Sequence, residues 1–222
     1  MFRHCPPKEI PNLQSKTHED GKRYYTLPNG KMVPSVTTVV GAKKKQSILE
    51  WRKRVGEDEA NRISKMATGR GNRVHLIAEK YLKNDPIDWA KEMPDAVEMF
   101  RTLVRPIHRI NNIHYQEQAL WSEKLELAGR VDLIAEFDGV LSVIDFKTSK
   151  KIKTKEDVPE YFAQCTAYSC MYEELVGHPI DQLVVLMAVE NEKEPLIFVE
   201  KTTDHLYNLY DHIKYYRNTL DL

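Results

Sequence analysis

The sequence predicts a single domain of mixed α/β structure in which a sheet is flanked by helices. Two observations carry this prediction. Apolar residues recur at helical spacing through residues 46–110, and apolar runs of strand length follow from residue 114 onward. The 222 residues are enough to bury one sizeable core. Helices first, then a meander of strands, then a helix, further strands and a closing helix are typical of a mixed sheet with helices packed against it.

The first element is predicted to be a hairpin. The segment RYYTLPNGKMV, residues 23–33, alternates around the turn-forming residues Pro28, Asn29 and Gly30. We expect it to lead into a strand formed by PSVTTVVG, residues 34–41, because this segment is rich in β-branched side chains.

Helices are predicted next. Residues 46–83 follow a helical pattern, and we expect it to break near Thr68–Gly71, where two glycines lie close together. A further helix over residues 94–110 should be interrupted at Pro106, because proline has no amide hydrogen to donate.

The sheet is predicted from residue 114 onward. Three strands are expected over residues 114–123, 129–137 and 140–148. A helix over 156–177 should follow, with Pro159 in its first turn and Gly177 at its end. Two more strands, 182–189 and 195–201, and a helix over 204–220 complete the chain.

The composition limits the possible classes of protein. The 33 basic and 33 acidic residues balance, so net charge alone does not indicate a nucleic-acid partner. The three cysteines form no CxxC pair, which argues against a zinc cluster or a disulfide framework and favours a reducing compartment. The start of the chain has no apolar or arginine-rich leader, and no apolar run reaches about 18 residues. We therefore expect a cytoplasmic protein without membrane contact.

The strand VLSVIDFKT ends in charged residues. Asp145 and Lys147 share one face of this strand with aliphatic residues. The dipeptide Asp138–Gly139 before it favours a two-residue type I′ turn, whose register would place Asp132 opposite Asp145 and Arg130 opposite Lys147. Two opposed carboxylates destabilise a sheet unless a proton, a basic group or a metal ion neutralises them.

A divalent metal ion is the favoured way to neutralise the two carboxylates. Carboxylate, water and phosphate oxygens suit Mg²⁺ or Mn²⁺. Lys147 could then hold an attacking water and offset charge on a phosphate. The residues alone leave open a simpler interpretation, in which Asp145 and Lys147 form an ordinary ion pair and Asp132 is solvated.

Several motifs in this order resemble the PD-(D/E)XK nucleases of the RecB type. They are GRVD, IDFKT and a helix with Gln164-x-x-x-Tyr168, preceded by PSVT, GRGNRVH and a strand with a glutamate. The order is most similar to that of the mitochondrial genome maintenance exonucleases and their bacteriophage relatives, and it extends from Pro34 to Val189. The resemblance implies a restriction-endonuclease-like core over about residues 113–200 and an N-terminal helical cap over about residues 34–112.

The resemblance also implies roles for individual residues. Lys147 matches the catalytic lysine, and Asp132 and Asp145 match the metal-binding acids of the catalytic centre. The metal ligands would be completed by the main-chain carbonyl of Phe146, by His75 and by Glu117. Without the neighbouring motifs, His75 would be interpreted as a surface histidine and Glu117 as a solvent-facing strand residue. An iron–sulfur cluster is not expected, because it needs four cysteines.

Nucleic-acid contacts are predicted around this centre. Gln164 and Tyr168 project from one helical face toward a phosphate or base, although Tyr168 also continues an apolar stripe. Lysines crowd just beyond the proposed site, where they could follow a phosphate backbone. The candidate contacts are Lys150, Lys151, Arg70, Arg73, Ser35 and Thr37, together with Lys153, Lys155 and the basic runs 43–45 and 52–54.

The sequence therefore predicts a Mg²⁺- or Mn²⁺-dependent DNA exonuclease of replication, recombination or repair. Single-stranded ends are the expected substrate, a 5′-phosphate product is implied by the resemblance, and a single-strand-binding or recombination protein is the expected partner. Two alternatives stay open. One is a structure-specific or restriction-like endonuclease with the same site, and the other is a catalytically silent nucleic-acid-binding module.

Overall fold

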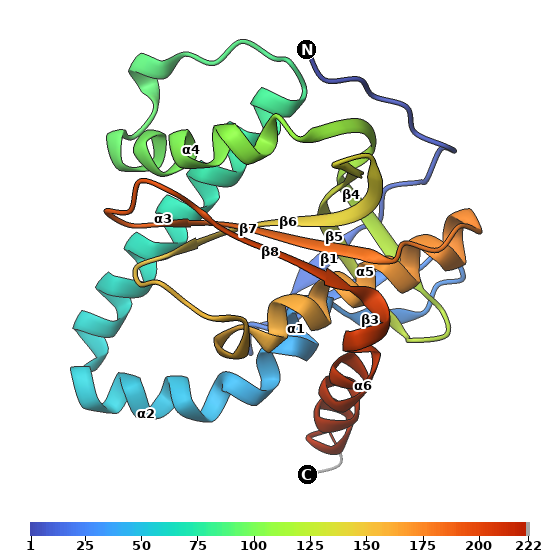
Figure 1. The fold of residues 1–222 in the computed structure, drawn as a ribbon. Coiled ribbons are helices and arrows are strands. Elements are labelled where there is room, and N and C mark those ends of the chain that lie inside the picture. The colour runs from blue at the N-terminus through green and yellow to red at the C-terminus, as the bar shows by residue number, and fades with distance from the viewer. Residues whose placement is uncertain (221–222) are drawn as a thin grey trace.

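A five-stranded mixed sheet forms the centre of the computed structural model, which describes residues 1–220 (Figure 1). Its strands are β4 (Ile110–Ser122), β5 (Leu127–Phe137), β6 (Val140–Ser149), β7 (Gln182–Val189) and β8 (Leu196–Lys201), in this spatial order. β6 and β7 run parallel, and the other neighbours run antiparallel. The predicted mixed sheet flanked by helices is confirmed.

Helices cover both faces of this sheet (Figure 1). On one face, alternate residues of β7 such as Val184 and Leu186 pack with α3 (Glu57–Leu82) and α4 (Pro94–Ile107). On the other face, residues such as Leu183 and Val185 pack with α1 (Val36–Gly41), α5 (Pro159–Val176) and α6 (Thr202–Asn218). Burial on both faces explains the continuous apolar run of β7.

The connection between β6 and β7 follows the prediction closely. Parallel strands need a long crossover, and α5 provides it. Pro159 occupies the first turn of α5, and Gly177 ends it in a left-handed conformation with φ of 88°. The segment before α5 contains η3 (Lys155–Asp157), which Thr154 and Asp157 cap reciprocally.

The N-terminal hairpin is confirmed, but the strand predicted after it is wrong. β1 (Ser15–Thr17), β2 (Arg23–Thr26) and β3 (Met32–Pro34) form a small antiparallel sheet. The segment PSVTTVVG then begins α1, because Ser35 accepts a hydrogen bond from the Thr38 amide at 3.1 Å and caps the helix. Val36, Val39 and Val40 are buried on one helical face, so tertiary packing overrides their β propensity.

The break predicted near Thr68–Gly71 is also wrong. The helical region begins with η1 (Ala42–Lys44) and divides at Gly56, with φ of 87°, between α2 (Lys45–Val55) and α3. α3 continues through both later glycines. A Cβ on Gly71 would lie 3.3 Å from Thr148 Oγ1, so this glycine lets α3 approach the end of β6.

The remaining helices agree better with the sequence. A short η2 (Trp89–Lys91) precedes α4, and Pro106 lies in the last turn of α4, which ends one residue later. None of the residues Lys45–Val55 of α2 is buried, and the helix projects from the body of the protein (Figure 1). Within residues 1–220, no helix has the length and apolar character that crossing a membrane requires.

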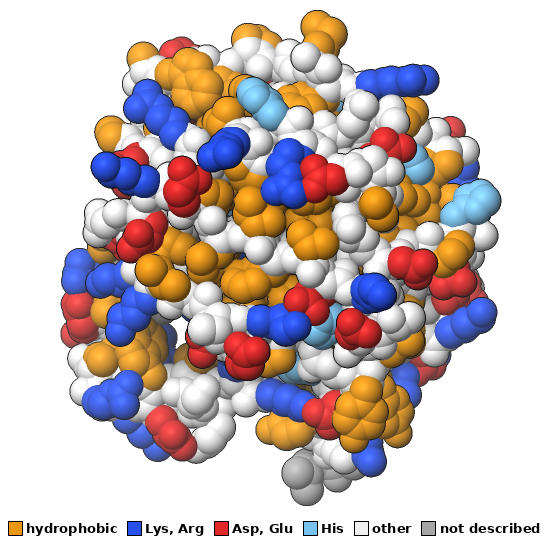
Figure 2. Space-filling model, viewed as in Figure 1, with side chains coloured by type: hydrophobic (Ala, Val, Ile, Leu, Met, Phe, Trp, Pro, Cys, Tyr) orange, Lys and Arg blue, Asp and Glu red, His pale blue; other side chains and the backbone are white. Residues whose placement is uncertain are grey.

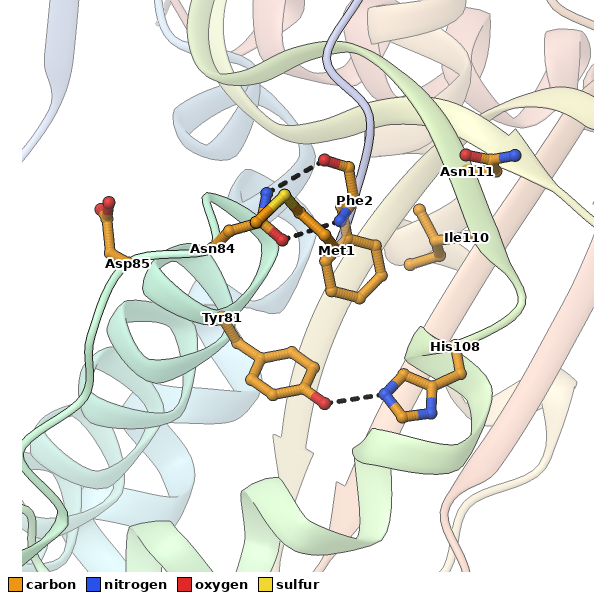
Figure 3. Close-up of a pocket in the computed structure, with 8 residues that line it drawn as sticks. All are labelled: Met1, Phe2, Tyr81, Asn84, Asp85, His108, Ile110 and Asn111. Carbon is orange, nitrogen blue, oxygen red and sulfur yellow. Dashed lines mark hydrogen bonds between the residues drawn. The ribbon is translucent and has the colours of Figure 1, made fainter.

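The first residues of the chain join α3 to β4. The Cys5 amide donates to the Ile113 carbonyl at 2.7 Å, and the Asn84 side chain bonds both the amide and the carbonyl of Phe2 (Figure 3). A pocket of about 400 Å³ lies here, where the Tyr81 hydroxyl and His108 are 2.7 Å apart. This segment fixes the C-terminal end of α3 against the sheet.

Gly129 and Tyr168 form one packing unit between β5 and α5. A Cβ on Gly129 would lie 2.7 Å from the Tyr168 hydroxyl and 3.0 Å from its ring. Tyr168 is 2% exposed, so it has little room to move away. Gly129 is therefore required because Tyr168 of α5 leaves no room for a side chain there.

Replacing Gly129 by alanine should destabilise the fold by about 1–3 kcal/mol, the usual cost of overpacking a core. Urea denaturation measures this change. Gly41→Ala is the control, because Gly41 is helical and a methyl group added there would meet no atom within 4 Å. Adding Tyr168→Phe should recover part of the loss by removing the closest contact. Wild-type stability in Gly129→Ala would contradict this account.

Candidate active site

Three side chains that could hold a metal ion meet beside β5. They are His75 of α3, Glu117 of β4 and Asp132 of β5, and one ligand atom from each lies within 4.8 Å of the others. His75 Nδ1 lies 3.4 Å from Asp132 Oδ2. All three are half-buried, so water and an ion can reach them. One imidazole and two carboxylates form a donor set that fits a divalent cation.

Glu117 owes its position to an irregular point in β4. Its neighbours Gln116 and Gln118 pair with Leu133 and Val131, so Glu117 lies opposite Asp132. The backbone of Glu117 has φ of 49°, a left-handed conformation rare for a residue with a side chain. The Arg130 guanidinium donates to the Glu117 carbonyl and supports this backbone. Backbone strain of this kind is often found at functional sites.

The turn between β5 and β6 confirms the predicted register only in part. Asp138 and Gly139 both have positive φ, as a type I′ turn requires, and pairing runs from Phe137–Val140 to Leu133–Ile144.

The ladder ends there, so the predicted opposed pairs Asp132–Asp145 and Arg130–Lys147 are not ladder pairs. Instead, Asp132 Oδ2 accepts a hydrogen bond from the Phe146 amide at 3.0 Å. The Asp132 carboxylate thus accepts the hydrogen bond of a main-chain amide at the point where β5 and β6 stop pairing.

Asp145 is buried next to the His75 group, and the charges of Asp132 and His75 both act on it. It is 2% exposed. Gln164 donates to its Oδ1 at 2.9 Å, and Lys147 Nζ lies 2.5 Å from its Oδ2. Lys147 supplies the opposite charge for this buried carboxylate, and Gln164 supplies a neutral hydrogen bond. Asp145 is therefore both the acid of the predicted ion pair and one of the predicted metal ligands.

The electrostatics of these acids favour a bound cation. Burial, with the charges of Asp132 and Glu79, raises the pKa of Glu117 to about 7. Burial raises the pKa of Asp145 to about 6, although the charge of Lys147 opposes this shift. Burial alone would lower the pKa of Lys147, but the charges of Asp145 and Asp132 raise it. Near neutral pH, Lys147 is therefore an ammonium ion beside an ionised Asp145.

Phe146 connects the two groups. Its amide binds Asp132, and its ring packs edge-on against His75 with 6.4 Å between ring centroids. The residue lies between Asp145 and Lys147, whose side chains point to the opposite face of β6. A role of the Phe146 carbonyl as a metal ligand stays a prediction.

The predicted nucleic-acid contacts divide by exposure. Gln164 is buried against Asp145, Tyr168 lies in the core, and Ser35 is buried as a helix cap. Arg70 and Arg73 form ion pairs with Glu190 and Glu92 at 3.2 and 3.4 Å. Four candidates are exposed, namely Thr37, Arg73, Lys150 and Lys151. Binding of nucleic acid by any of these residues stays a prediction.

The other basic residues that the sequence singles out are partly engaged. Lys43 pairs with Asp211, Lys44 with Glu160, Arg52 with Glu57 and Lys155 with Glu200. Pairs between exposed side chains contribute little stability, whereas Glu160 of the Lys44 pair is buried.

Sequence reasoning missed three residues around the site. Arg130 supports the Glu117 backbone, Glu79 raises the pKa of Glu117, and Tyr161 places its ring beside Lys147. Tyr161 precedes Gln164 by three residues, so helical periodicity could have placed it on the same face. No sequence pattern indicates the other two, because their roles depend on the left-handed Glu117.

The raised pKa of Glu117 predicts a pH-dependent stability when no divalent ion is supplied. The folded state holds a proton that the unfolded state releases between pH 4.5 and about 7, so stability falls as pH rises through this window. Glu117→Gln should therefore be more stable than wild type by about 1 kcal/mol near pH 8, after allowance for partial exposure, and equal to it near pH 4.

Thermal melts in a chelating buffer test this prediction. About 1 kcal/mol corresponds to a rise of about 2–4 °C in melting temperature for a chain of this size. Glu123→Gln is the matched control, because Glu123 is exposed just after β4 and should show no such rise. Equal melting temperatures for Glu117→Gln and wild type at both pH values would contradict the burial of this charge.

The chain is similar to several known proteins. Human mitochondrial genome maintenance exonuclease 1 is 29% identical over 133 residues, which cover 55% of this chain and 38% of that protein. The chain thus spans well under half the length of this relative.

Two crystal structures are more distant, each with 14% identity. A Eubacterium rectale protein named "Putative exonuclease" matches with a TM-score of 0.44 over 69% of this chain and 68% of its own. A protein designated SSO0001 matches with a TM-score of 0.41 over 81% and 74%. The sequence pattern of the PD-(D/E)XK nuclease superfamily matches residues 46–218. The chain therefore belongs to the PD-(D/E)XK nuclease superfamily, whose members use divalent metal ions.

Proposed function

We propose that this nuclease is a metal-dependent DNA exonuclease that prefers single-stranded ends. The observation that carries the proposal is the meeting of His75, Glu117 and Asp132 next to the buried Asp145–Lys147 pair. The first group supplies ligands for a cation, and the second supplies a fixed ammonium. Hydrolysis of a phosphodiester can use both, because each stabilises negative charge in the transition state.

The proposed metal ligands are His75, Glu117, Asp132, Asp145 and the Phe146 carbonyl, with Mg²⁺ or Mn²⁺ as the ion. When bound, the ion would lower the pKa of a water and stabilise negative charge on the phosphate. Glu117 and Asp145 would hold such an ion in their ionised forms, so protons would compete with it as the pH falls toward their raised pKa values.

Lys147 is the proposed catalytic lysine. Its ammonium stays charged and lies close to the acids, so it can orient the attacking water and offset the charge that develops on the phosphate. Gln164 is proposed to keep the Asp145 carboxylate in one orientation through its hydrogen bond to Oδ1. Asp132 is oriented by the Phe146 amide.

Two features support a nucleic-acid strand as the substrate. Lys150 and Lys151 are exposed just beyond β6, and the charge of Lys150 reaches Glu59 of α3, so this loop runs beside the helical cap. Figure 2 shows a hollow in the surface between the lobe with α2, at lower left, and α6, at the bottom. A strand that entered there would meet cationic side chains, whose attraction for phosphates weakens with salt.

The exonuclease is favoured over an endonuclease by the name of the human relative. The distinction is tested with circular single-stranded DNA and with end-labelled linear DNA of the same sequence. Loss of the linear substrate with intact circles supports the proposal. Nicked circles would favour the restriction-like or structure-specific endonuclease. Labels at the 5′ and 3′ ends determine the polarity in the same assay.

The proposal extends to the setting of the reaction. Digestion of single-stranded ends belongs to replication, recombination or repair, so a single-strand-binding or recombination protein is the proposed partner. The proposed location is the cytoplasm, including that of a host cell if the source is viral.

Lys147→Ala and Asp145→Ala should each lower kcat for DNA digestion by about 10²–10³-fold, the usual effect of removing a group that stabilises developing charge. Binding of DNA should persist in Lys147→Ala. Fluorescence anisotropy with labelled single-stranded DNA measures binding, and gel digestion measures kcat. Lys193→Ala, an exposed lysine, is the control for charge. Full activity in either variant would refute the assignment and favour a silent binding module.

Stabilisation by Mn²⁺ should increase with pH. Near about pH 5.5 protons occupy Glu117 and Asp145 and compete with the ion, whereas near about pH 8 both are ionised. The rise in melting temperature at a fixed Mn²⁺ concentration should therefore be several-fold larger at about pH 8, and it should be lost in Asp132→Ala. A shift that is independent of pH would place the ion elsewhere.

A further inference from the structure

The ammonium of Lys147 has a second neighbour besides Asp145. Its Nζ lies 5.1 Å from the centroid of the Tyr161 ring, within the range of a cation–π interaction. Lys153, in the loop after β6, places its Nζ 5.8 Å from the same ring. One aromatic ring thus contacts both the proposed catalytic lysine and the loop that carries the exposed lysines.

We infer that Tyr161 is a positioning residue for phosphodiester hydrolysis, which holds the Lys147 ammonium in place through the face of its ring. This inference rests on the proposed function. Tyr161 acts through Lys147 and is assigned no contact with the substrate.

The ring supplies a restraint that the ion pair alone does not. A lysine side chain has four rotatable bonds, and one carboxylate fixes only its distance. A cation that binds Asp145 competes with Lys147 for that carboxylate. The attraction between the Tyr161 ring and the Lys147 ammonium does not depend on Asp145 and is kept. Tyr161 therefore keeps Lys147 beside the site when Asp145 serves another partner.

The first turn of α5, which carries Tyr161, is anchored to neighbouring elements. Tyr161 lies in the first turn of α5, where the Pro159 carbonyl accepts a hydrogen bond from Asn208 at 2.6 Å. Glu160 is buried and paired with Lys44, and Phe162 stacks on His205 with 4.5 Å between centroids. Both sequence neighbours of Tyr161 are therefore anchored to other elements, which fixes the backbone that carries the ring.

Tyr161 and Gln164 share a face of α5. Gln164 fixes the Asp145 carboxylate, and Tyr161 fixes the Lys147 ammonium. One helical turn thus orients both members of the ion pair. A purely structural role would require only apolar volume at Tyr161, so the variants below change the ring and the volume separately.

The test compares Tyr161→Phe, Tyr161→Leu and Tyr161→Met in digestion of end-labelled single-stranded DNA with Mn²⁺. Phenylalanine keeps the ring, so its kcat should stay within about 2-fold of wild type. Leucine and methionine should lower kcat by about 5- to 30-fold, the worth of a desolvated cation–π contact, and should leave KM within about 2-fold. Phe198→Leu is the matched control, because Phe198 packs edge-on against Phe162 at 6.1 Å.

A second readout needs no activity. Reductive methylation without added metal, followed by mass spectrometry, gives the rate at Lys147 relative to exposed Lys193 in the same chain. This ratio should rise several-fold in Tyr161→Leu and Tyr161→Met and stay unchanged in Tyr161→Phe. Melting temperatures identify any variant that fails to fold, and the methionine variant then takes the place of leucine.

Each other result has a defined meaning. Wild-type kcat and methylation in both ring-less variants would overturn the inference, and so would an equal loss in Phe198→Leu. A loss in Tyr161→Phe as large as in Tyr161→Leu would assign the effect to the hydroxyl and would also overturn it. Absence of digestion by the wild type would refute the proposed function, and the methylation ratios would still decide whether Tyr161 restrains Lys147.

Discussion

Asp145 places a carboxylate inside the protein, and the surrounding structure compensates for that charge. Removing a carboxylate from water costs several kcal/mol unless opposite charge and hydrogen bonds replace its hydration. Lys147 supplies the charge and Gln164 supplies the hydrogen bond. These partners come from β6 and α5, so the crossover helix must pack in one rotation about its axis. The sheet, the helix and the chemistry are therefore coupled through one buried ion.

Much of the fold follows from local sequence rules, and the failures have one common cause. The Asp138–Gly139 turn and the caps of α5 depend on residues adjacent in sequence, and all were predictable. The strand expected at PSVTTVVG failed because a buried helical face outweighed β propensity. The break expected near Gly71 failed because that glycine serves the contact with Thr148. Packing between distant segments decided both cases.

In the candidate site, too, local sequence predicts some features and packing between distant segments decides the others. Asp145 and Lys147 could be placed on one face from strand alternation alone, and their ion pair bears this out. The partner of Asp132 could not be placed, because the left-handed backbone of Glu117 and the early end of the β5–β6 ladder arise from tertiary contacts. His75 reaches the site through the docking of α3, which depends on residues far along the chain.

α2 has a consequence for how the protein responds to its environment. A helix with no buried residue draws almost none of its stability from the core, so the free energy needed to open it lies far below that for global unfolding. Its opening would leave the two packed clusters and the sheet unchanged. α2 can therefore be remodelled, or cut by a protease, as a separate thermodynamic unit, while the sheet and the helices packed on it keep their cooperativity.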